Sequence, residues 1–213
     1  VRSQGRAPFL YGDTNMTKSI LDLEPKPVWK HFNDICGTYR ESTHEGVIRD
    51  FLISYANELG LSHDADAKGN LVIRKGASNS KSTKTVILQA HMDMVCVKGA
   101  ESDHDFKSDK IVPVVDGEWV TAKGETTLGA DDGISIAAYM SIMEDTDLVH
   151  GPIEFLFTVE EETGLHGATA LDPHLLTGKI LINTDSEEDG YLTIGCAGEE
   201  SLVVSHPILR EPA

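Results

Sequence analysis

The chain has 213 residues, of which 40% are hydrophobic, and a formal net charge of −17. This composition indicates a globular protein with a buried core rather than a disordered chain. The negative charge argues against nucleic acid and anionic membranes as partners, although bound cations could offset part of it. The sequence contains no apolar run near the ~18 residues that a membrane-spanning helix needs. Three cysteines, odd in number and far apart, favour a reducing, cytoplasmic setting without a disulfide framework.

Two helices are predicted near the N-terminus. An apolar stripe that includes Trp29 and Phe32 predicts a helix over residues 23–36, which Gly37 ends. Ser42 and Glu45 have the spacing of a capping box, so we expect a second helix to begin at Ser42.

The rest of the chain alternates between apolar strands and turns. Hairpins are predicted at residues 63–75 and 111–122, and a helix follows the turn at residues 126–133. Further strands are predicted at residues 85–95, 152–159, 178–185 and 191–196. The fold class that follows is α/β, with a mixed, centrally parallel sheet and helices on both faces.

The strand at residues 85–95 ends in a polar pair, His91 and Asp93. Histidine is a good ligand for transition metals, and Asp93 would point to the same side of an extended segment. It could therefore fix the tautomer of the His91 ring. The alternative is a hydrogen-bonded histidine at the end of a strand, and the pair alone does not decide between them.

Acidic residues follow the other strands. Asp131 and Asp132 begin a helix between two glycines, where helix capping explains one aspartate but not both. Glu160–Glu162 follow a buried strand, and three adjacent carboxylates repel one another unless solvent or a cation surrounds them. Asp185 ends a later apolar strand.

In a largely parallel sheet, the C-terminal ends of the strands meet at one edge. His91 and these carboxylates would then form one cluster. One histidine with several carboxylates and no cysteine suits zinc or manganese in a hydrolytic site.

Five segments, QAHMDMV, TLGADDG, FTVEEETG, INTDSEEDG and GCAG, resemble the dinuclear zinc amidohydrolases that include carboxypeptidase G, aminoacylase and peptidase T. They occur in the order and roughly the spacing of that family, and the resemblance covers residues 23–198. Within it, the segments are most similar to those of the dipeptidases that cleave Xaa-His peptides. The resemblance implies a small peptide or N-acyl amino acid as substrate.

The resemblance also implies a role for each site residue. His91, Asp131, Glu162 and Asp185 would bind two zinc ions, which manganese or cobalt could replace, and Asp131 would bridge them. The same match makes Glu161 the general base, and Asp93 the residue that orients His91.

The match ends at residue 198. Residues 16–198 would be the first part of a catalytic domain, residues 199–213 a tail outside the family pattern, and residues 1–15 a leader or added extension. The lid and dimerisation domain of the family and its last metal-binding histidine are absent from the sequence. His206 could in principle replace that histidine, but Pro207 and the tail-like surroundings argue against it.

Three hypotheses follow for the function. The first is a metal-dependent dipeptidase of the Xaa-His type, and the second is a truncated fragment that binds divalent metal with little or no activity. The third keeps the fold but changes the substrate to another amide or an ester. The oligomeric state stays open, because the dimerising domain of the family is missing.

Overall fold

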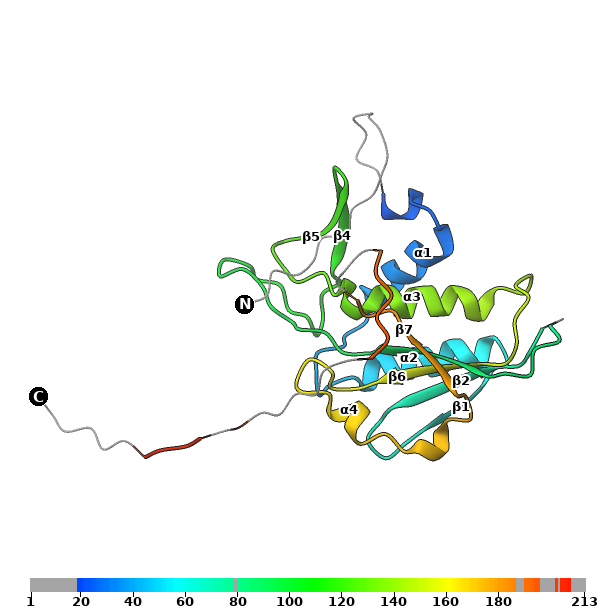
Figure 1. Ribbon diagram of the computed structural model, residues 1–213. Helices are drawn as coiled ribbons and strands as arrows, with labels where there is room; N and C mark the ends of the chain where they lie inside the picture. The colour runs from blue at the N-terminus through cyan, green and yellow to red at the C-terminus, as the bar shows by residue number, and fades with distance from the viewer. Residues whose placement is uncertain (1–18, 79, 187–189, 196–201, 203, 208–213) are drawn as a thin grey trace, which may run out of the picture.

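The computed structural model describes residues 19–78, 80–186, 190–195, 202 and 204–207. Its centre is a five-stranded sheet in the order β1-β2-β6-β3-β7 (Figure 1). The strands are β1 (Ser62–Ala65), β2 (Leu71–Lys75), β3 (Val86–His91), β6 (Ile153–Thr158) and β7 (Ile180–Asn183). β3 runs parallel to both β6 and β7, whereas β2 is antiparallel to β6 and β1. The predicted mixed, centrally parallel sheet is therefore confirmed.

The register of the parallel strands decides where the site forms. His91 lies beside Thr158 at the end of β6, and Gln89 lies beside Asn183 at the end of β7. The residues that follow these three strands therefore leave the sheet at the same edge, as expected for parallel strands.

One face of the sheet is covered by three long helices: α1 (Lys26–Ile35), α2 (Gly46–Glu58) and α3 (Ala130–Glu144). Each places apolar side chains at helical spacing on this face, such as Phe32, Leu52 and Ile136, which are at most 1% exposed. They pack with Phe155 and Phe157 of β6 in one core. Burying one such side chain contributes about 1.5–3 kcal/mol to folding.

The opposite face is covered by a shorter segment that contains α4 (His166–Thr169) and a 3-10 turn, η2 (Pro173–Leu175), below the sheet in Figure 1. Leu171, Leu175 and Leu176 from this segment pack on a second core of Val72, Ile87 and Leu156. Helical turns thus lie on both faces, as predicted, but the long helices share one face.

Three elements lie outside the sheet and its helices. β4 (Val112–Asp116) and β5 (Trp119–Lys123) form the predicted second hairpin, and η1 (Ile20–Asp22) precedes α1. Among the described residues, every helix falls short of the length and apolar character needed to cross a membrane.

Two predictions of secondary structure are wrong. α2 begins at Gly46 rather than Ser42, because Thr43 has a left-handed backbone and the Ser42 hydroxyl bonds to Asp93 instead of capping the helix. Residues 191–195 form no strand, and the side chains of Tyr191, Leu192 and Ile194 are largely exposed. Cys196, residues 1–15 and most of the predicted tail lie outside the described residues, so the domain boundaries stay predictions.

Candidate metal centre

His91 and Asp93 lie at the C-terminal end of β3 and are almost completely buried, with 1% and 0% of their side chains exposed. The Nδ1 atom of His91 is 3.4 Å from Oδ1 of Asp93. This side of the imidazole therefore faces a carboxylate, which is the arrangement that fixes the orientation of a metal-binding histidine.

The other ring nitrogen of His91 faces two more carboxylates. Nε2 is 2.8 Å from Oδ1 of Asp131 and 3.8 Å from Oδ2 of Asp185. Asp131 comes from the start of α3, where the backbone of Asp131 and Asp132 departs from helical geometry. Asp185 follows β7. Ligand atoms of His91, Asp131 and Asp185 lie within 4.8 Å of one another, close enough to bind one metal ion.

A second group forms on the side of β6. Glu161 and Glu162 follow this strand, and their carboxylates lie with His91 in another set whose ligand atoms are within 4.8 Å of one another. The backbone N–H groups of Glu161 and Glu162 donate to Asp93, over 3.0 and 3.2 Å. Asp93 thus contacts both the histidine ring and the turn that carries the two glutamates.

The electrostatics of the cluster reflect crowded negative charge. Burial and the charge of Asp131 raise the pKa of Glu162 to about 7. Burial also raises the pKa of Glu161, with nearby carboxylates adding to the shift. Burial raises the pKa of Asp93 too, but the adjacent imidazole of His91 and hydrogen bonds from the Glu161 amide and Ser42 outweigh it and lower the value to about 2.

These observations fit a divalent metal. Carboxylates surround Nε2 of His91, and the described donor set contains imidazole and carboxylate but no thiolate, which suits zinc, manganese or cobalt. A cation would stabilise the ionised forms of Glu161 and Glu162, whose pKa values are raised by burial and then by neighbouring carboxylates.

The structure brings together all six residues that the sequence singled out, namely His91, Asp93, Asp131, Glu161, Glu162 and Asp185. Neither group, as far as the described residues go, contains a second histidine. His206 is exposed and belongs to neither group. The individual roles of the six residues stay predictions.

Sequence reasoning missed the contribution of Asp132. Its carboxylate is buried and accepts the backbone N–H of His91 over 3.2 Å, which ties the start of α3 to the end of β3. Burial raises the pKa of Asp132 to about 7. The paired aspartates between glycines were the available signal, because helix capping accounts for one of them only.

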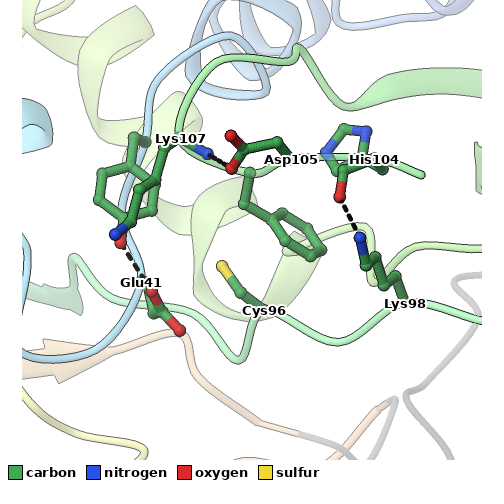
Figure 2. Close-up of a pocket in the computed structure, with 8 residues that line it drawn as sticks. Glu41, Cys96, Lys98, His104, Asp105 and Lys107 are labelled. Atoms are coloured by element: carbon green, nitrogen blue, oxygen red, sulfur yellow. Dashed lines mark hydrogen bonds between the residues drawn. The ribbon is translucent and has the colours of Figure 1, made fainter. Parts of the chain in front are cut away.

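A separate hollow lies outside this cluster. A cavity of about 270 Å³ is lined by residues of two loops: Tyr39, Glu41, Cys96, Lys98, His104, Asp105, Phe106 and Lys107 (Figure 2). None of the six cluster residues lines it. Burial raises the pKa of the Cys96 thiol to about 11, so this thiol is protonated and a poor nucleophile near neutral pH.

A mixed α/β sheet with histidine and carboxylates at the ends of its parallel strands is an arrangement of metal-dependent hydrolases. Residues 70–200 match the sequence model of peptidase family M28. The chain belongs to this family of peptidases.

Individual relatives agree with this assignment. The chain is 46% identical over 180 residues to the cytosol non-specific dipeptidase of Escherichia coli, covering 84% of this chain and 37% of that protein. It is 31% identical over 176 residues to the uncharacterized protein YqjE of Bacillus subtilis, covering 78% and 44% of the two chains.

Solved structures of peptidases are also similar to this chain. The crystal structure of aminoacylhistidine dipeptidase from Vibrio alginolyticus matches with a TM-score of 0.78 and 45% identity, over 81% of this chain and 35% of that one. Aminopeptidase PepT from Bacillus cereus matches with a TM-score of 0.64 and 27% identity, over 76% and 43%. The chain thus spans less than half the length of these relatives.

Proposed function

We propose that the chain carries the metal-binding part of a peptidase that hydrolyses the amide bond of dipeptides of the Xaa-His type. The observation that carries the proposal is the pair of ligand groups around His91, at the ends of three parallel strands. The named activities of the Escherichia coli and Vibrio relatives support a dipeptide as the substrate.

The residues that would hold two zinc ions are His91, Asp131, Glu162 and Asp185. His91, Asp131 and Asp185 form one ligand group, so we assign them to one ion. Asp131 would also help to hold the second ion. Glu162 would bind the second ion. Manganese and cobalt accept the same nitrogen and oxygen donors and would be the substitutes.

Bound divalent metal lowers the pKa of a water molecule and polarises the scissile carbonyl group. Glu161 would accept the proton of that water as its oxygen attacks the carbonyl carbon. It would return the proton to the amine nitrogen as the C–N bond breaks, so Glu161 ends the cycle ionised. A raised pKa suits this role, because the group must both accept and release a proton near neutral pH. Asp93 would hold the His91 ring in place.

The test is hydrolysis of Xaa-His dipeptides by the full chain with added zinc or manganese. We expect Glu161→Ala to reduce turnover by about 100-fold or more, the usual contribution of a general base. Glu118→Ala removes an exposed glutamate from the turn between β4 and β5 and is the matched control. Equal rates for the wild type and Glu161→Ala would refute the mechanism.

Two alternatives are tested beside this proposal. A metal-binding fragment with little activity agrees with the short coverage of the relatives and with ligand groups that share a single histidine. Calorimetric titration combined with the turnover assay separates it from the enzyme, because two tight metal sites plus turnover would argue against the fragment. A related amide or ester substrate would instead appear in a panel of N-acyl amino acids and esters.

We also propose a cytoplasmic location. The name of the Escherichia coli relative supports it, as do the free thiols of Cys36 and Cys96.

A further inference from the structure

The connection between α1 and α2 contacts three separate parts of the proposed metal site. The contacts come from residues 40–45 of this connection, which are referred to below as the 40–45 segment. Its side chains reach the residues after β3, the residues before α3 and the acidic turn after β6. The segment contributes none of the proposed metal ligands.

Arg40 makes the first two of these connections. Its side chain is fully buried, and Nη1 donates to the carbonyl oxygens of Met92 and Asp93 over 3.3 and 3.1 Å. Nη2 donates to the carbonyl oxygen of Gly129. A buried guanidinium is costly unless its donors are satisfied, and here they are used to join the end of β3 to the start of α3.

The guanidinium also explains the glycines around Asp131 and Asp132. A Cβ atom at Gly133 would lie 2.6 Å from Nη2 of Arg40, and one at Gly129 would meet the same atom. The two glycines therefore leave the space that Arg40 occupies. Gly129 also has a φ of 70°, a left-handed backbone that itself favours glycine.

Ser42 and Glu45 make the remaining connections. The Ser42 hydroxyl donates to Oδ2 of Asp93 over 2.8 Å, and Oε1 of the buried Glu45 accepts the backbone N–H of Glu160 over 2.9 Å. Glu160 directly precedes the two glutamates of the site. The 40–45 segment thus fixes the carboxylate behind His91 and the start of the acidic turn together.

We propose that Arg40, Ser42 and Glu45 are positioning residues that set the relative placement of His91, Asp131 and the Glu161–Glu162 turn for metal binding. The inference rests on the proposed metal site and goes beyond it, because it assigns metal affinity to residues that touch no metal. Residues in this position typically change metal affinity about 10-fold to 100-fold when they are replaced.

The test uses Arg40→Lys, which keeps the charge but loses the planar fork of donors, and Ser42→Ala, which removes one hydroxyl. His44→Ala is the control from the same segment, because the His44 side chain is exposed and its ring lies near Tyr39. Zinc affinity is measured by calorimetry on protein that circular dichroism shows to be folded. Amide hydrogen exchange of the metal-free protein is measured at Glu161 and Glu162, with the amides of β1 as reference.

We expect zinc affinity to fall about 10-fold or more in Arg40→Lys and Ser42→Ala and to stay unchanged in His44→Ala. Amides of Glu161 and Glu162 should exchange about fivefold faster in Ser42→Ala, which is the equivalent of about one hydrogen bond, while β1 stays unchanged. Folded variants with wild-type affinity and wild-type exchange would overturn the proposal.

If Arg40→Lys does not fold, Ser42→Ala decides by the same criteria. A wild-type chain that binds no zinc would contradict the proposed function. In that case, amide exchange in the metal-free protein still decides whether the 40–45 segment positions the turn.

Discussion

His91 is buried at the C-terminal end of β3, and its Nε2 atom lies 2.8 Å from Oδ1 of Asp131, whose side chain is 59% exposed. Burial alone would lower the pKa of His91, but the hydrogen bond to Asp131 and the nearby carboxylates of Asp93 and Asp132 reverse the shift and raise it to about 11. We therefore expect the imidazole to be protonated in the metal-free protein at neutral pH. A metal ion must displace this proton before it can bind Nε2.

Metal binding at pH 7.5 should consequently release protons. The folded, metal-free pKa of His91 lies above this pH, so we expect about one proton from His91 per protein, with a further fraction from Glu162, whose pKa is about 7. Affinity should rise as the pH is raised from 6 to 8, because fewer protons compete. Calorimetry in two buffers with different ionisation enthalpies measures the number released, and a value near zero would show that His91 is neutral or unbound.

Asp93→Asn should weaken metal binding without abolishing the fold. The amide keeps the shape of the carboxylate and can still accept the N–H of Glu161, but it loses the charge that faces Nδ1 of His91. We expect zinc affinity to fall about 10-fold to 100-fold. Titration calorimetry is the measurement, and Asp64→Asn, at an exposed ion pair with Arg74, is the control that should bind zinc as the wild type does.

The sequence predicted the placement of the cluster well because the parallel strands carry local signals. One apolar run ends at His91, another just before the acidic turn and a third close to Asp185. The local sequence therefore indicates where each polar group lies relative to the end of its strand. The sheet then brings the ends together without further information.

The supporting contacts could not be predicted in the same way. Arg40 looks like any charged residue in a loop, and its partners are backbone carbonyls up to 89 residues away. Ser42 fits a capping box by spacing, yet a tertiary contact with Asp93 replaces that local interaction. Such contacts depend on the packing of α1, α2 and β3, which no local pattern encodes.

Glu154→Gln should destabilise the protein near neutral pH. The Glu154 carboxylate, 2% exposed, accepts hydrogen bonds from Thr177 and from the backbone N–H of Gly178, which lead into β7. An amide group would place donors against these donors, at a cost of about 1–3 kcal/mol. Urea unfolding at pH 7 measures the effect, and Glu118→Gln at an exposed turn should change the free energy of unfolding by less than about 0.5 kcal/mol.

The cost of Glu154→Gln should also depend on pH. Burial raises the pKa of Glu154, but the bonds from Thr177 and Gly178 outweigh it and hold the pKa below its ordinary value. The stability it contributes is therefore present above the unfolded pKa and is lost as the pH falls through the folded pKa. Wild type and Glu154→Gln should converge in stability at low pH, and a constant difference from pH 7 down to pH 3 would contradict the assignment.

Gly167→Ala should disturb the acidic turn itself. A Cβ atom at this position would lie 2.7 Å from the backbone nitrogen of Val159 and from Oδ1 of Asn70, and would also meet the Val159 carbonyl oxygen. Backbone cannot yield as a flexible side chain can, so we expect a loss of about 1–3 kcal/mol in the free energy of unfolding. Because Val159 leads directly into the turn that carries Glu161 and Glu162, zinc affinity should fall as well.

Gly46→Ala is the matched control for this prediction. A Cβ atom at Gly46 meets nothing within 4 Å, and the residue begins α2, so alanine should leave stability unchanged or raise it by up to about 1 kcal/mol. Thermal unfolding of the metal-free chain and zinc titration are the measurements. If Gly167→Ala unfolds and binds zinc as Gly46→Ala does, the close packing of α4 against Val159 does not hold the acidic turn in place.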